Sequence, residues 1–305
     1  MSIGRFAPSP TGPLHLGNLR TAVVAWLFAR SASSPFLLRV EDLDPSTQTG
    51  EHEQGQLDDL ASLGIDWDGD VERQSDRFDL YHDALERLAE QSRTYDCFCS
   101  RREVREAAMA SHGPATHYPG TCRHLTTAER AERRRAGRPA AIRFLGNGGS
   151  IEFVDRIAGT STAVVDDVVL RRNDGTPAYN LAVVVDDADQ GIEEVVRGDD
   201  LLLSTPAQIA VGRALGLADR VYAHVPLAYG PSGDRLAKRD GAVTLHDIEA
   251  LGVSADTVTK QILDSIFGPD APGSMREAKE RFSPIDIEWG PWNLSADQLA
   301  PEDQL

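Results

Sequence analysis

The sequence has no long hydrophobic run. Its longest apolar stretch, Ala22–Ala29, is far too short to cross a bilayer. The N-terminus carries Arg5 and three prolines where a secretory signal peptide would be apolar. A hydrophobic content of 41% and a charged content of 26% are typical of a globular protein in water. We therefore expect a cytoplasmic protein that has no membrane partner.

Cysteine is scarce, and all of it lies in one segment. The three cysteines are Cys97, Cys99 and Cys122. Disulfides are rare in a cytoplasmic chain, so clustered thiols indicate a metal site, with three free buried thiols as the alternative. Tetrahedral zinc needs a fourth ligand. The residues themselves leave that ligand open between three neighbours: His117, Tyr118 and His124.

Lysine is equally scarce, with three in the chain, so nearly all positive charge comes from arginine. The net charge of −17 disfavours a nucleic-acid partner, because phosphate contacts need cations. The charge is uneven, however. Residues 41–90 carry sixteen acidic side chains and three arginines, whereas residues 97–140 carry nine arginines and four glutamates. We expect the basic segment to contact nucleic acid, and the alternative is an arginine-rich helix that only faces solvent. Candidate phosphate contacts are Arg101, Arg102, Arg133 and Arg134.

Residues 5–18 combine a short extended segment, a loop rich in proline and glycine, and the start of an apolar-periodic run. A strand, such a loop and a helix start form a typical phosphate site, since the first helical N–H groups have no internal partner. His15 adds a donor at that point. Gly17 would let a flat ligand approach the backbone closely. The stretch therefore predicts a nucleotide site.

The order of these residues carries a resemblance. Arg5-Phe6-Ala7-Pro8-Ser9-Pro10-Thr11-Gly12, followed by His15-Leu16-Gly17-Asn18, resembles the first signature of class I aminoacyl-tRNA synthetases of the glutamate-specific branch. The resemblance implies an α/β fold: a Rossmann-type doubly wound parallel sheet forming the catalytic core. It also implies that ATP, with Mg²⁺, activates L-glutamate to glutamyl-adenylate. ATP would then contact His15, Gly17 and Asn18, with His15 and Asn18 as catalytic residues.

The second class I signature, KMSKS, has a degraded counterpart in residues 235–239. The sequence there is Arg235-Leu236-Ala237-Lys238-Arg239, in which both serines are lost and the second lysine is kept. The resemblance implies that Lys238 is catalytic and binds the triphosphate of ATP, an electrostatic role. The alternative is an ordinary basic turn.

A glutamate pocket needs cations for two carboxylates and an acid for the ammonium group. Arg5 and Arg197 would supply the cations and Glu41 the acid, because guanidinium suits bidentate carboxylate recognition. For isolated charged residues, surface ion pairs are the alternative. The resemblance implies the full glutamate-binding set: Arg5, Phe6, Ala7, Pro8, Ser9, Glu41, Tyr179 and Arg197.

The cysteine segment and the short C-terminal part narrow the resemblance. Cys-x-Cys followed by Tyr118-x₃-Cys122 is similar to the glutamyl-queuosine tRNA(Asp) synthetase family, which implies structural Zn²⁺ bound by Cys97, Cys99, Tyr118 and Cys122. Only 66 residues follow Arg239, fewer than a helical anticodon-binding domain needs. The family transfers glutamate to queuosine in the anticodon stem-loop of tRNA(Asp). The alternatives are a truncated glutamyl-tRNA synthetase that charges a tRNA 3′ end, and a non-catalytic paralogue that binds nucleotide or glutamate. We expect a monomer.

The expected domains follow from the motifs and the local patterns. Residues 1–94 would form the first half of the catalytic domain, 95–177 an inserted zinc-bearing α+β subdomain, 178–241 the second half with the KMSKS-like loop, and 242–305 a short helical region. Apolar periodicity predicts strands at 3–7 and 35–41 around a helix at 18–30. Further helices are expected at 51–63, 77–92, 128–136 (with a capping box of Thr126 and Glu129) and 205–215. Further strands are expected at 141–144, 150–154, 164–171, 181–185 and 193–197, with a turn at 173–175.

Overall fold

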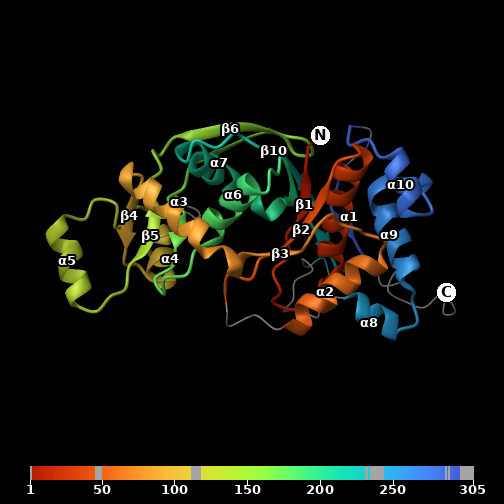
Figure 1. Cartoon of the computed structure of the whole chain (residues 1–305), viewed down its shortest axis with the longest axis horizontal. Helices are drawn as coiled ribbons and strands as arrows, with labels where there is room; N and C mark the ends of the chain where they lie inside the picture. Colours follow the sequence, from red (N-terminus) through yellow and green to blue (C-terminus); the bar gives the residue numbers. More distant parts are fainter. Residues whose placement is uncertain are drawn as a thin grey trace.

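Different parts of the chain build the two ends of the molecule (Figure 1). Helix α5 (Thr127–Arg135) lies at one end of the long axis, and helix α10 (Met275–Arg281) lies near the other. The computed structural model describes residues 2–44, 50–110, 118–230, 233, 244–285, 287 and 289–295, with the backbone alone for 108–110.

The N-terminal part is a parallel strand–helix–strand unit. Strands β1 (Gly4–Phe6), β2 (Phe36–Val40) and β3 (Glu72–Arg73) pair in parallel in that order. Helix α1 (Leu16–Ser31) joins β1 to β2 as predicted, beginning two residues earlier than expected. Eleven of its side chains are buried, because α1 packs against the sheet on one side and the C-terminal helices on another. The unit therefore anchors the main hydrophobic core.

A second set of strands extends this sheet. Strands β9 (Glu194–Gly198) and β10 (Val221–Val225) are parallel to each other and follow the order β7-β6-β10-β9. A parallel bridge between Ile3 and Ile192 puts the start of β9 beside β1. The central sheet is thus parallel from β3 to β6, which confirms the predicted class of fold and brings the carboxyl ends of β1, β2 and β9 to one edge.

Strand β6 (Ser150–Asp155) and its antiparallel partner β7 (Gly159–Val164) join this central sheet, although they fall within the range expected for the insertion. The predicted strand 164–171 is wrong as a single element: β7 ends at Val164, and β8 (Val169–Arg171) belongs to another sheet. The chain turns between them because the buried carboxylate of Asp167 accepts hydrogen bonds from Gly146 N–H at 2.8 Å and from Arg123.

A small antiparallel sheet carries the cysteine segment. Strands β4 (Thr94–Cys97), β5 (Ala141–Phe144) and β8 pair in that order, with α4 (Arg101–Ala110) and α5 beside them. The predicted capping box of α5 is present, with both Thr126 and Glu129 making their reciprocal bonds. These elements form the end of the molecule that lies away from α10 (Figure 1).

Residues 181–185 were expected to form a buried strand and instead lie in helix α6 (Tyr179–Asp189). The run Leu-Ala-Val-Val-Val is apolar because α6 packs between α3 (Phe78–Glu90) and α7 (Thr205–Ala214). A short apolar run in a buried helix has the same local pattern as a buried strand, so the tertiary packing decides between them.

The C-terminal part is mainly helical, as expected, but also adds a strand. Strand β12 (Trp292–Asn293) pairs in parallel with β11 (Ala228–Tyr229). The predicted helices 51–63, 77–92, 128–136 and 205–215 agree with the structure to within two residues at each end. No helix in the described ranges has the length and apolar character needed to cross a membrane. Among the described residues, the remaining helical elements are α2 (Gly50–Ser62), α8 (Leu245–Ala250), α9 (Ala255–Phe267) and three 3₁₀ turns at Gln74–Arg77, Asp199–Ser204 and Gly268–Asp270.

Candidate active site

Helix α1 begins with a histidine cap. His15 Nδ1 accepts a hydrogen bond from the Asn18 backbone N–H at 3.3 Å, and the Asn18 side-chain oxygen accepts one from the His15 N–H at 3.3 Å. Because Nδ1 is the acceptor, a neutral His15 carries its proton on Nε2. The predicted donor is therefore present at the helix start, where the dipole favours an anion.

Glycine at position 17 also has a packing reason. A Cβ there would lie 3.1 Å from His15 Nδ1 and 3.2 Å from the Cβ of Ala228 in β11. The absence of a side chain thus lets the His15 ring and β11 pack against the helix start. Gly17 also lines the cavity described next, so the predicted approach of a ligand to its backbone stays a prediction.

A cavity of about 520 Å³ opens beside the start of α1, at the carboxyl ends of β1, β2 and β9. Open parallel sheets bind ligands at this edge. Lys238 and the other residues of 235–239 lie outside the described residues. Every other predicted ATP or glutamate residue lines the cavity: Arg5, Phe6, Ala7, Pro8, Ser9, His15, Gly17, Asn18, Glu41, Tyr179 and Arg197.

Arg5 is buried and already paired with a carboxylate. Its Nε and Nη2 donate to the two carboxylate oxygens of Asp187 at 3.1 and 3.2 Å, and Nη1 donates to the Val196 carbonyl at 3.1 Å. Asp187 also accepts from Arg39 at 2.9 Å. Burial alone would raise the pKa of Asp187, but the two arginines outweigh it and hold that pKa below its ordinary value. Arg5 therefore braces the cavity wall, and Asp187 offsets its charge.

Glu41 lies in the same wall but is less strongly paired. Arg39 Nη2 lies 3.7 Å from Glu41 Oε1. Burial raises the pKa of Glu41 to about 7; the arginines lower it, and the nearby carboxylates add to the rise. A carboxyl group that is half ionised near neutral pH gains charge when a cation approaches, as the ammonium of an amino acid would.

Among the described residues that line the cavity, Arg197 is a cation without a carboxylate at ion-pair distance. Its side chain is 6% exposed. Its Nε donates to His224 Nε2 at 3.1 Å, Nη2 to Thr205 Oγ1 at 2.8 Å, and Nη1 to the Tyr179 hydroxyl at 3.5 Å. All three acceptors are uncharged when His224 is neutral. Within the described parts of the chain, no carboxylate lies at ion-pair distance from Arg197. A buried cation of this kind favours an anionic ligand.

Sequence reasoning missed the residues that hold these arginines. Asp187 follows an apolar run that was read as a strand, and His224 and Asp155 stand in ordinary strand sequences with no motif around them. The available signal in the sequence was a charged residue at the end of an apolar run. It became informative only when the fold brought the residues together.

A second cavity, of about 1110 Å³, continues from the first toward the cysteine segment. The two cavities share Ser9, Thr11, Glu41 and Tyr179. The second is lined by Cys97 and Cys99 and by several arginines from three different elements and loops: Arg101, Arg105, Arg143 and Arg172. A groove with positive charge along it therefore leads to the first cavity.

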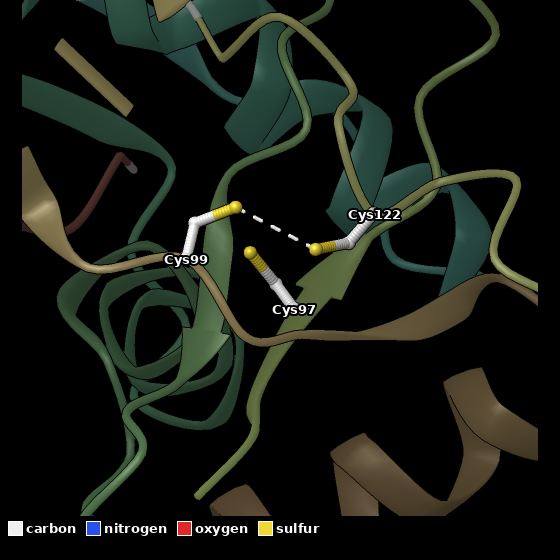
Figure 2. Close-up of side chains that lie close together, drawn as sticks. All are labelled: Cys97, Cys99 and Cys122. Carbon is white, nitrogen blue, oxygen red and sulfur yellow. Dashed lines mark hydrogen bonds between the residues drawn. The ribbon is translucent and has the colours of Figure 1, made fainter. Parts of the chain in front are cut away.

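The three cysteines point toward one another from β4, the chain after it, and the loop before α5 (Figure 2). Their sulfur atoms all lie within 4.8 Å of one another, and Cys99 Sγ lies 3.5 Å from Cys122 Sγ. The Tyr118 hydroxyl lies 3.3 Å from Cys97 Sγ and 3.7 Å from Cys99 Sγ. Of the other two candidate ligands, His124 is exposed and His117 lies outside the described residues.

This donor set fits a tetrahedral metal ion. With metal–sulfur distances near 2.3 Å, tetrahedral ligand atoms lie about 3.8 Å apart, close to the separations observed. A hydrogen bond from Cys99 lowers the pKa of the Cys97 thiol, and the thiolate is the form that binds metal. Arg143 lies 3.7 Å from the centre of the Tyr118 ring and adds positive charge beside the cluster.

Comparison with known proteins agrees with this geometry. The family described as tRNA synthetases class I (E and Q), catalytic domain, matches residues 3–271. A glutamyl-Q tRNA(Asp) synthetase of Nocardia farcinica is 54% identical over 299 residues, covering 97% of this chain and 94% of that protein. One of Symbiobacterium thermophilum is 47% identical, covering 98% of each chain. A glutamate–tRNA ligase of Aquifex aeolicus is 41% identical, covering 92% of this chain and 60% of the ligase.

Solved structures give the same picture. A crystal structure of a glutamate tRNA ligase from Elizabethkingia meningosepticum, in complex with its amino acid, superposes with a TM-score of 0.82 and 26% identity over 98% of this chain and 68% of that one. A glutamate-tRNA synthetase from Elizabethkingia anophelis gives a TM-score of 0.83 at 26% identity, over 98% of this chain and 69% of that one. The chain therefore belongs to the class I tRNA synthetases (E and Q), among the relatives named glutamyl-Q tRNA(Asp) synthetase, and is a ligase of the aminoacyl-tRNA synthetase type.

Proposed function

We propose that this ligase activates L-glutamate with ATP and Mg²⁺ and transfers it to queuosine in the anticodon stem-loop of tRNA(Asp). The observation that carries the amino-acid part is Arg197, a buried cation that faces no carboxylate among the described residues and lines the cavity at the start of α1. The acceptor part rests on the names of two relatives, which are 54% and 47% identical and carry the name glutamyl-Q tRNA(Asp) synthetase.

In this proposal the glutamate side chain or α-carboxylate binds Arg197, and the ammonium group binds Glu41. Tyr179 and Ser9 line the pocket and offer hydroxyl groups. One carboxylate of glutamate thus meets the charge of Arg197, since charge-assisted bonds to carboxylate are the strong ones.

The first chemical step is attack of a glutamate carboxylate oxygen on the α-phosphorus of ATP, which forms glutamyl-adenylate and releases pyrophosphate. The chain needs no nucleophilic side chain for this step, so positioning and charge stabilisation carry the rate. The N–H groups at the start of α1 and the Nε2–H of His15 donate to phosphate oxygens, and Asn18 keeps the His15 ring in place through the cap. Lys238 would steady the leaving pyrophosphate.

The second step is attack of a queuosine hydroxyl on the adenylate, which gives an ester and releases AMP. The groove lined by Arg101, Arg105 and Arg172 joins the glutamate pocket. Arg172 is paired with Asp44 and Asp174, so Arg101 and Arg105 are the candidate contacts to an RNA backbone. We also propose that Cys97, Cys99, Tyr118 and Cys122 bind one structural Zn²⁺, which would tie β4 to the loop before α5.

Pyrophosphate exchange tests the first step. Wild-type protein with glutamate and ATP, without tRNA, should exchange labelled pyrophosphate, and Arg197→Gln should lose this activity at ordinary glutamate concentrations. A protein that binds glutamate and ATP but gives no exchange would be a binding paralogue instead.

Two RNA substrates test the second step. We expect glutamate on an isolated anticodon stem-loop that carries queuosine, and none on the same loop with guanine. Mild base should release it, because the linkage is an ester. Charging of an intact tRNA 3′ end, with no product on the stem-loop, would favour the alternative of a truncated glutamyl-tRNA synthetase.

A further inference from the structure

His224, on β10, holds one edge of the Arg197 guanidinium. Arg197 Nε donates to His224 Nε2 at 3.1 Å, and the neighbouring Nη2 donates to Thr205 Oγ1 at 2.8 Å. His224 is 1% exposed and Thr205 0% exposed, so water cannot replace either acceptor. Because Nε2 must accept, the neutral His224 ring carries its proton on Nδ1.

Asp155, at the end of β6, accepts a hydrogen bond from His224 Nδ1–H and so keeps the proton on Nδ1. Its Oδ2 lies 2.6 Å from His224 Nδ1. Its Oδ1 accepts from the backbone N–H groups of Ile157 at 2.9 Å and Ala158 at 2.8 Å, so the β6–β7 turn holds the carboxylate in one orientation. Asp155, His224 and Arg197 therefore form a chain of hydrogen bonds that runs from the end of β6 to the cavity.

Burial and the charge of Arg197 keep His224 neutral near pH 7. The titratable groups that face it are Asp155 on β6, Arg197 on β9, Asp199 in the turn after β9, and Tyr222 on its own strand, whose ring lies 6.0 Å away. Burial and then Arg197 lower the pKa of His224, against the opposing effect of the two carboxylates. Protonation would turn the acceptor at Nε2 into a donor that faces the Arg197 Nε–H.

We propose that His224, oriented by Asp155, is a positioning residue that aims Arg197 at the substrate carboxylate and thereby sets the affinity for glutamate. The inference rests on the proposed function, since Arg197 must be the carboxylate-binding cation. Without the acceptor at Nε2, the guanidinium is free to turn away from the cavity, because its remaining partners, Thr205 and Tyr179, leave its Nε unpaired.

Two substitutions of His224 separate the acceptor from the rest of the ring. Glutamine puts its Oε1 where Nε2 was, whereas asparagine puts its amide where Nδ1 was and leaves Arg197 Nε without an acceptor. In pyrophosphate exchange, His224→Asn should raise the KM for glutamate about 10- to 100-fold with the KM for ATP unchanged within about 2-fold. His224→Gln should stay within about 3-fold of wild type. Glu194→Gln, which removes another buried carboxylate at the start of β9, is the matched control and should change neither KM.

Asp155→Asn tests the orientation of the His224 ring without changing the histidine itself. The new amide would donate to Nδ1, move the ring proton to Nε2 and repel the Arg197 Nε–H. It should raise the glutamate KM like His224→Asn, and it should have no further effect in the His224→Gln background. This arm and the pH arm below decide the question if His224→Asn does not fold.

A pH profile supplies a readout that a purely structural role would not move. The ratio of the wild-type glutamate KM to that of His224→Gln should rise as the pH falls through the lowered pKa of His224, since only the histidine can be protonated. A constant ratio across the pH range in which the His224 ring titrates by NMR, or equal rises in the KM for glutamate and ATP in Asp155→Asn, would overturn the inference. If one of these results appears while Arg197→Gln still loses glutamate binding, only the role of His224 is contradicted and the proposed function stands. If the wild-type protein gives no pyrophosphate exchange, the proposed function itself is contradicted.

Discussion

At the scale of single residues, two carboxyl groups near the same arginines have different charge states. Asp187 accepts from Arg5 and Arg39 at 2.9 to 3.2 Å, and its pKa lies below the ordinary value. Glu41 is 3.7 Å from Arg39, and burial raises its pKa to about 7. Distance thus decides which carboxyl neutralises the arginines and which stays available to a ligand cation.

The Glu41 pKa predicts a pH dependence of glutamate binding. The pKa is raised above 4.5 in the folded protein, so Glu41 is mostly protonated below pH 7 and ionised above it. The ammonium of glutamate needs the ionised form. We expect kcat/KM for glutamate in pyrophosphate exchange to increase between pH 6.5 and 8.5 with a midpoint near 7. Glu41→Gln should show the low-pH value throughout, and a flat wild-type profile over this range would contradict the role of Glu41.

Lys238 is the second prediction at this scale. It stands in the KMSKS-like stretch of a chain with three lysines and lies outside the described residues. We expect Lys238→Ala to lower pyrophosphate exchange by about 100-fold or more while leaving the melting temperature unchanged, because it removes charge stabilisation of the leaving group. Lys260→Ala, on α9, is the matched control. If Lys238→Ala exchanges pyrophosphate at the wild-type rate, the second signature has no role in the mechanism.

At the scale of elements, the small sheet of β4, β5 and β8 has little core of its own. Its buried cluster consists of Tyr95, Cys97, Phe98, Tyr118 and Cys122, so three of the five are proposed metal ligands. Salt bridges such as Arg134–Asp96 are exposed and add little stability. The metal would therefore hold these elements together more than hydrophobic packing does.

Metal removal tests this. Structural zinc binds with free energies of about 10–16 kcal/mol, so we expect a strong chelator to open this segment locally. Hydrogen exchange should increase for residues 94–145 and stay slow in α1 and β9. Tyr118→Phe should make chelation easier while retaining the fold of the loaded protein. Purified protein without stoichiometric zinc, and with freely titrating thiols, would contradict the metal site.

At the scale of the whole molecule, an acidic protein has several of its arginines along one groove. The net charge is −17, yet the cavity that runs from the glutamate pocket to the cysteine cluster is lined by four arginines. Of the arginines predicted from sequence to contact RNA, Arg101 lines this cavity, whereas Arg134 is paired with Asp96 and Arg133 with Cys122 and the Phe98 ring. The groove therefore has a narrower set of candidate phosphate contacts than the basic segment as a whole.

We expect binding of the queuosine stem-loop to weaken steeply with salt, since contacts to phosphate release counterions. Arg101→Ala combined with Arg105→Ala should weaken binding by about 10-fold or more at low salt and reduce the slope of log Kd against log salt. Arg281→Ala, on α10, is a matched control at the far end of the molecule and should change neither. If the double variant has the same salt slope as wild type, the RNA binds to another surface.

Much of this protein could be predicted from the order of its residues. The loop of residues 5–18 and the cap of α1 depend on local sequence, because prolines, glycine and a capping histidine act within a few residues of one another. The same holds for the Thr126–Glu129 capping box. The identity of the cavity-lining residues followed from motif resemblance, since ligands meet parallel sheets at strand ends.

Only the tertiary structure decided the features that the local sequence pattern leaves open. Residues 181–185 became a helix because α3 and α7 enclose them, and β6 joined the central sheet because β10 offers it a parallel edge. The pairing of Arg5 with Asp187 joins residues 182 positions apart, and the contact of His224 with Asp155 joins residues 69 positions apart. No periodicity encodes such pairs. Buried charges select their partners only after the chain has folded, because desolvation then makes every unpaired group costly.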